Sequence, residues 1–175
     1  MRLPARLGGL ALAALPLAGP ALACEYLTEH FELCLEGSPW AGGRWENGGD
    51  SATLYIRDER YVQELSFEGF EDYYGKDRRK ALSDDLAAVT EATGSDETRV
   101  EMDRDRFRTA DLKVVRVVNM TSFAGDAPHL VVEMIAAAKG ERIFIRMNGP
   151  SDMPVPEMKA ISQDMAARIH PRGQS

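Results

Sequence analysis

Residues 111–147 read DLKVVRVVNMTSFAGDAPHLVVEMIAAAKGERIFIRM, and this stretch decides the fold. Apolar residues alternate with other residues in three segments of it, residues 111–123, 130–138 and 141–147. Alternation of this kind is typical of β-strands. The connections are turns of a few residues that contain Gly125 and Pro128 or Gly140. Because short connections join antiparallel neighbours, the stretch predicts an antiparallel meander.

The first strand of this meander is apolar on both of its faces. One face carries Leu112, Val114, Val118 and Met120, and the other carries Val115 and Val117. A strand that is apolar on both faces needs cover on both sides of the sheet. We therefore expect residues 111–123 to form a central strand.

Strand patterns also lie upstream of the meander. They cover residues 30–36, 52–57, 60–67 and 98–102, and the second and third of these form a hairpin around Asp58 and Glu59. Residues 37–50 are rich in glycine and predict a long loop. The charged run Asp103-Arg104-Asp105-Arg106 resembles the start of a calcium loop, but Arg108 stands where that loop needs a glycine and Val114 where it needs a glutamate. We therefore expect a solvated hairpin turn there.

Two segments have the apolar period of an amphipathic helix. Within residues 77–93 the stripe is Leu82, Leu86, Val89 and Thr93; near the C-terminus, through about Arg168, it is Met158, Ile161, Met165 and Ile169. Each stripe must be buried against a sheet face. The sequence therefore predicts an α+β layered sandwich, in which an antiparallel sheet of about six to seven strands, hairpin plus meander, carries two packed helices.

This order of elements resembles that of the PsbP/DcrB-like α/β sandwich family. The resemblance spans Phe31 to Ile169 and rests on element order, without a diagnostic motif. Members of that family include exported bacterial proteins and photosystem extrinsic proteins, and their functions are diverse. The resemblance therefore implies a fold rather than a role, and no functional residue is transferred from it.

Residues 1–23 have the features of an export signal. Arg2 and Arg6 give a positive start, an apolar middle follows, and Ala21-Leu22-Ala23 is a small-x-small cleavage site. The apolar stretch is short and interrupted by glycine and proline, which argues against a membrane span. We expect residues 1–23 to be a cleaved signal peptide and residues 24–175 to be a single α+β domain without a transmembrane span.

The charge of the mature chain restricts its partners. The full chain has a formal net charge of −7, and losing Arg2 and Arg6 with the signal lowers this to −9. An acidic protein of this kind is unsuited to nucleic acid and to anionic lipid surfaces. We expect no nucleic-acid partner.

The two cysteines, Cys24 and Cys34, allow two interpretations. In an oxidising compartment a pair at this spacing forms a disulfide, which would stabilise the fold by about 2–3 kcal/mol. Alternatively, Cys24 is the lipidated first residue of a lipoprotein, since lipoprotein signals are also cut before a cysteine. Ala21-Leu22-Ala23 fits ordinary signal cleavage better. A redox-active pair is not expected, because the chain has no Cys-x-x-Cys spacing.

The sequence contains no recognisable catalytic, metal or cofactor motif. His30, His129 and His170 lie in separate elements, without zinc-motif spacing. There is no nucleophile elbow, phosphate loop or dinucleotide fingerprint. We predict no catalytic residue, no metal and no cofactor. An enzyme built from scattered acids such as Glu46 and Asp50 is the weaker alternative.

Two patches are candidate binding surfaces. Trp40, Arg44 and Trp45 lie on the glycine-rich loop, and tryptophan and arginine are frequent at binding hot spots. The competing interpretation folds both indoles back over the sheet edge. Tyr73 and Tyr74 lie beside a basic run, and their competing interpretation is a solvated helix entry.

These observations predict an exported, non-catalytic accessory or binding protein of the bacterial periplasm. Its expected partner is an envelope protein, and the loop from Trp40 to Trp45 is the expected contact. The alternatives are a lipoprotein tethered through Cys24 and an enzyme with an unrecognised site.

Overall fold

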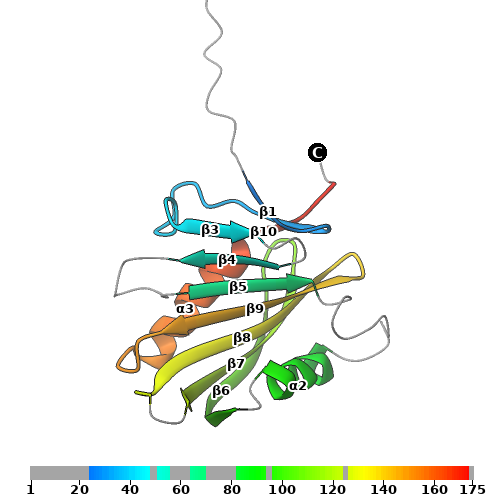
Figure 1. Cartoon of the computed structure of the whole chain (residues 1–175). Coiled ribbons are helices and arrows are strands. Elements are labelled where there is room, and N and C mark those ends of the chain that lie inside the picture. The colour runs from blue at the N-terminus through cyan, green and yellow to red at the C-terminus, as the bar shows by residue number, and fades with distance from the viewer. Residues whose placement is uncertain are drawn as a thin grey trace, which may run out of the picture.

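The computed structural model describes residues 24–47, 51–55, 64–69, 82–93, 96–123 and 126–173. These residues form a seven-stranded sheet, a three-stranded sheet and two helices (Figure 1). All strand pairs are antiparallel, so the predicted α+β class is confirmed. None of the helices described has the length and apolar character needed to cross a membrane.

The large sheet has the strand order β3-β4-β5-β9-β8-β7-β6. Its strands are β3 (Arg44–Asn47), β4 (Ser51–Tyr55), β5 (Glu64–Gly69), β6 (Glu97–Arg108), β7 (Lys113–Phe123), β8 (His129–Ala138) and β9 (Glu141–Gly149). The meander predicted from residues 111–147 is β7-β8-β9. As expected, β7 lies inside the sheet with a neighbour on each side. β3 was missed because it lies in a segment whose glycines predicted a loop.

The charged run at residues 103–106 is part of strand β6 and not a hairpin turn, which corrects the sequence prediction. β6 continues to Arg108, and the turn to β7 follows it, where Thr109 N donates to Leu112 O at 3.1 Å. The register with β7 shifts by one residue between Glu101 and Asp103. After this shift, the odd-numbered residues of β6 face the opposite side of the sheet from the odd-numbered residues before it. The charged residues can lie in a strand because Asp105 pairs with Arg116 of β7 and Asp103 pairs with Lys159.

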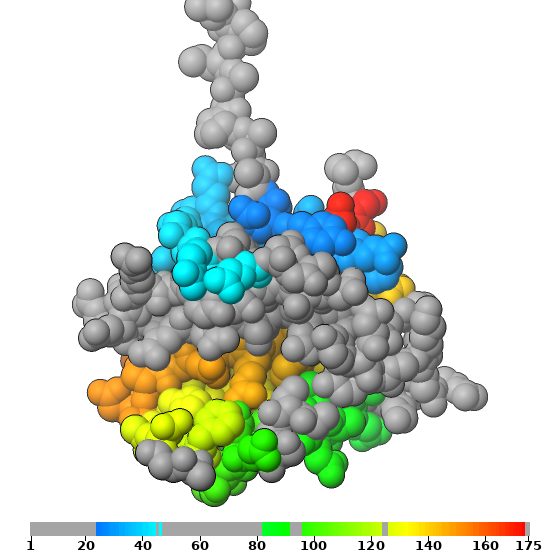
Figure 2. Space-filling model, viewed as in Figure 1, coloured from blue at the N-terminus to red at the C-terminus, as the bar shows by residue number. Residues whose placement is uncertain are grey.

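The small sheet joins the two ends of the described chain. It has the order β1-β2-β10, formed by β1 (Glu25–Thr28), β2 (Phe31–Leu33) and β10 (Ile169–Pro171). The strand expected at residues 30–36 is thus shorter and pairs outside the large sheet. In Figure 2 this sheet, blue and red, covers one end of the molecule.

Helices α2 (Leu82–Thr93) and α3 (Val155–Ala167) lie on opposite faces of the large sheet (Figure 1). Leu86 and Val89 of α2 pack on Val115, Val117, Ile135 and Phe144. Met158 and Met165 of α3 pack in a larger core that also holds Leu27, Phe31 and Leu33 of the small sheet. The helix predicted at residues 77–93 is described from Leu82 onward; its earlier part lies outside the described residues.

Candidate functional site

A disulfide joins Cys24 to Cys34. Cys24 precedes β1 and Cys34 follows β2, so the bond closes the hairpin of these two strands. Cys24, Glu32 and Cys34 are the one group of potential metal ligands found among the described residues, but the disulfide occupies both sulfurs. The bond is the one that the cysteine spacing predicted.

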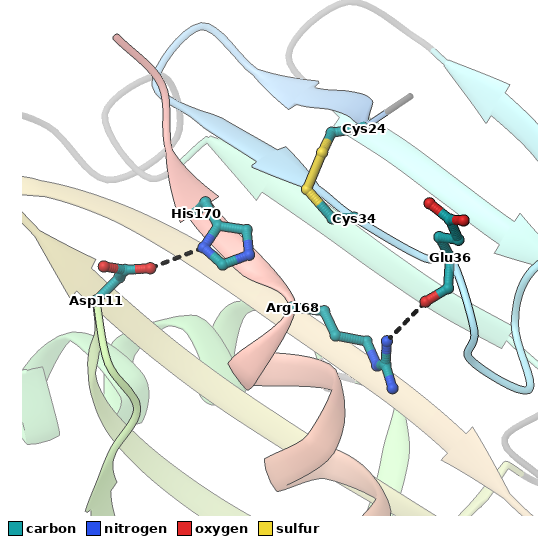
Figure 3. The surroundings of a disulfide bond; sticks show 6 residues. All are labelled: Cys24, Cys34, Glu36, Asp111, Arg168 and His170. Carbon is teal, nitrogen blue, oxygen red and sulfur yellow. Dashed lines mark hydrogen bonds and ion pairs between the residues drawn. A yellow bond between two sulfur atoms is a disulfide. The ribbon is translucent and has the colours of Figure 1, made fainter. Parts of the chain in front are cut away.

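The end of the chain holds the disulfide-closed hairpin in place (Figure 3). Cys34 N donates a hydrogen bond to Arg168 O at 3.0 Å, and the Arg168 guanidinium donates to Glu36 O at 3.3 Å. His170 lies on β10 rather than in a frayed tail, and its Nδ1 is 2.7 Å from an oxygen of Asp111. Residues more than 130 positions later in the sequence therefore support the first residues that the structure describes.

Trp40 is buried and does not form a binding surface, which corrects its place among the candidate contact residues. Its side chain is 1% exposed and belongs to the core on the α3 face. Local hydrogen bonds direct the chain inward here, since Trp40 N donates to Ser38 Oγ and the Ser38 hydroxyl donates to Leu35 O. The indole of Trp40 thus folds back into the protein because it is large and apolar.

The other candidate contact residues have different positions. Arg44 begins β3, is 72% exposed and lies 3.2 Å from Glu46. Trp45 pairs with Leu54 in the sheet, and its side chain lies outside the description. Tyr73 and Tyr74 lie outside the described residues, as does Asp50 of the enzyme alternative. Arg44 is therefore the one candidate contact whose side chain is described and exposed.

A buried ionic network lies between α2 and the sheet. Glu133 is fully buried and accepts hydrogen bonds from Arg99 at 3.0 Å and Asn119 at 3.2 Å. Arg99 also contacts Glu97 at 2.8 Å, and Arg146 contacts the same carboxylate at 2.6 Å. Burial raises the pKa of the Glu133 carboxyl, while the positive charges of Arg99 and Arg146 oppose the rise.

This network is a structural link rather than a ligand site. Its two carboxylates and two guanidiniums balance in charge. Arg99 also donates to the carbonyl of Thr90 in α2 at 2.7 Å, which ties the helix to the sheet. Sequence analysis did not find it because its members come from β6, β7, β8 and β9 and meet only through the sheet register.

A second ionic cluster lies on the α3 face. Arg116 is 2% exposed and donates to both carboxylate oxygens of Asp105. It also donates to Ser162 Oγ and to the carbonyl of Lys159. Hydrogen bonds from Arg116 and Lys159 hold the pKa of Asp105 below its usual range, and Lys159 does the same for Asp103. This cluster anchors α3 to the edge of the sheet.

The histidines do not converge within the described part of the chain. His30 lies 3.6 Å from Glu141, His170 pairs with Asp111, and His129 begins β8. Each histidine is thus in a different place, and the described residues bring none of them beside a second histidine.

Comparison with known proteins places this architecture in a structural class. No protein-family model and no curated protein matches the chain. The solution structure of cyanobacterial PsbP (CyanoP) from Synechocystis sp. PCC 6803 is similar, with a TM-score of 0.55 over 91% of this chain and 98% of that chain. The chain therefore has a PsbP-like fold, as its element order predicted. The two sequences are 14% identical, so the similarity establishes the fold alone.

Proposed function

We propose that this chain is an exported, non-catalytic binding or accessory protein of the bacterial periplasm. The observation that carries the proposal is the disulfide between Cys24 and Cys34. Disulfides form and persist in oxidising compartments and are rare in the cytosol. Cys24 is also the first residue after the predicted cleavage site, so the bond fastens the new N-terminus to the domain.

The disulfide favours free export over lipid anchoring. Lipidation uses the Cys24 sulfur for a thioether, and that sulfur is already bonded to Cys34. The sequence before the cysteine, Ala21-Leu22-Ala23, supports the same conclusion. A lipoprotein would need Cys34 as a free thiol beside the small sheet.

The proposed contact surface now centres on β3. Arg44 and Trp45 remain the proposed contact residues. Trp40 is no longer proposed as a contact because it is buried. Arg44 is mostly exposed and lies at the outer strand of the large sheet. An exposed arginine on an edge strand, with a tryptophan next to it in sequence, suits recognition of another envelope protein.

Fractionation followed by affinity capture tests the proposal. The tagged protein is expected in the periplasmic fraction, where it should retain an envelope protein that the double variant Arg44→Glu with Trp45→Ala does not retain. Glu32→Ala is a control outside the proposed surface, because Glu32 pairs with Tyr26 in the small sheet and is not part of β3. Cytoplasmic location contradicts export, and equal capture by both variants contradicts the contact surface.

A further inference from the structure

Four cations near the β6–β7 and β8–β9 turns have no carboxylate or aromatic partner among the described residues. They are Arg106, Arg108, Lys113 and Lys139. Every other arginine or lysine that the structure describes pairs with a carboxylate, except Arg172, which stacks on Tyr26. In a protein with a mature charge of −9, cations without acidic partners are unexpected.

Three of these cations line one groove. The groove has a volume of about 340 Å³ and lies between the start of α2 and the ends of β6 and β7. Arg106, Arg108 and Lys113 line it together with Leu82 and Ser83 of α2, and its described lining contains no acidic residue. Val115 and Leu82 provide an apolar wall, since both pack in the core beneath α2. A volume of this size suits a small ligand.

The sheet register places the three charges side by side. Arg108 lies directly opposite Lys113, and Arg106 lies opposite Val115 on the same face. Opposed residues in an antiparallel pair have their Cβ atoms about 5 Å apart, and like charges in such a pair are destabilising. No described carboxylate relieves the repulsion, so the arrangement favours an anion between the side chains.

A second, smaller groove of about 240 Å³ shares this pair of residues. Arg108 and Lys113 line it with Lys139, which adds a fourth cation. Asp111 also contributes to this lining, but its carboxylate faces His170 at 2.7 Å. The positive charge thus continues around the end of the sheet.

We propose that the groove lined by Arg106, Arg108 and Lys113 binds a small organic phosphomonoester. The dianionic phosphate group offers several acceptor oxygens, and one guanidinium group can donate hydrogen bonds to two of them at once. The carbon portion of the ligand lies against Leu82 and Val115. This assignment concerns the ligand and not the compartment, so its failure leaves the proposed export untouched.

Calorimetric titration of the purified protein with glycerol 3-phosphate tests the site. We expect saturable binding, weakened about tenfold or more in Arg108→Ala, because that variant removes a charge-assisted hydrogen-bond donor. Glycerol is the ligand control, since it lacks the phosphate. Arg104→Ala is the matched protein control: Arg104 lies on the same strand but is paired with Glu101, so its loss should leave binding unchanged.

Thermal unfolding separates lost binding from lost folding. Without ligand, Arg108→Ala should unfold at the same temperature as the parent or higher, because it removes the repulsion from Lys113. Glycerol 3-phosphate should raise the Tm of the parent protein and of Arg104→Ala but not that of Arg108→Ala.

Phosphatidic acid in phosphatidylcholine vesicles distinguishes a lipid source of the same phosphomonoester group. If the protein binds these vesicles through Arg108 but does not bind glycerol 3-phosphate, the ligand is a lipid headgroup. That result still supports the phosphate site. Absence of binding to both probes, or equal weakening by Arg104→Ala and Arg108→Ala, overturns the proposal.

Discussion

Arg116 of β7 and Asp105 of β6 are opposite each other in the sheet and form a two-pronged ion pair, with N–O distances of 2.9 and 2.7 Å. Arg116 is 2% exposed, whereas Asp105 is partly exposed. The pair connects the edge strand to α3 through Lys159 and Ser162. Removing either partner therefore affects both the sheet and the helix.

Asp105→Ala is expected to lower the free energy of unfolding by about 3 kcal/mol, because it leaves a buried guanidinium without its counter-charge. Urea denaturation measures this change. Arg104→Ala, at the neighbouring position, removes an exposed pair with Glu101. That variant should lose less than about 1 kcal/mol. Equal losses of unfolding free energy in the two variants would contradict the expectation that the buried pair stabilises the protein more than the exposed one.

The same pair gives the protein a defined dependence on acid. The hydrogen bond from Arg116 holds the pKa of Asp105 below the ordinary value of about 3.9, so its stabilisation is complete above that pH. It is lost as the pH falls through the lower pKa of the folded state. Asp105→Asn should therefore show a shallower loss of Tm between about pH 4 and pH 2. A slope identical to that of the parent protein would refute this expectation.

The disulfide should stabilise the domain by closing a short loop. Cys24 and Cys34 are separated by 10 positions, and a loop of this size contributes about 2–3 kcal/mol. Cys34→Ala should lower the free energy of unfolding by that amount, measured by urea denaturation without reductant. Adding reductant should lower the stability of the parent protein and leave the variant unchanged. A parent protein indifferent to reductant would contradict the expectation.

Trp40 should behave as a core residue in solution. Trp40→Ala is expected to lower the free energy of unfolding by about 3–5 kcal/mol, because it removes a large side chain that is 1% exposed. In Trp45→Phe, Trp40 is the remaining tryptophan, and its fluorescence should be blue-shifted and weakly quenched by acrylamide. Emission typical of a solvated indole would contradict the buried position.

The fold was predictable where residues near in sequence determine it. The meander β7-β8-β9 follows from apolar alternation and short turns, and the apolar stripes located α3 and the described part of α2. The small sheet was not predictable in this way, because residues 31–33 pair with residues 169–171 and no local pattern records that pairing. The predicted strand ended too early in β6, at residue 102, because the aspartates and arginines that follow have the composition of a turn.

The candidate sites show the same division. The spacing of Cys24 and Cys34 predicted their bond, since ten positions allow a closed hairpin. Composition alone could not tell whether Trp40 faces solvent or the core. The cations that have no partner among the described residues were also missed, because Arg108 and Lys113 become neighbours only through the register of β6 and β7. Whether a charged side chain has a partner depends on which residues are its neighbours in the fold, and the composition of the chain does not give that.

The intact mass of the protein recovered from its native cell envelope, measured without reductant, tests export most directly. The account predicts a chain that begins at Cys24, carries no lipid and is lighter by two hydrogen atoms than its reduced form. A mass larger by a glycerol and three acyl chains, or a chain that still begins at Met1 with two free thiols, would contradict it.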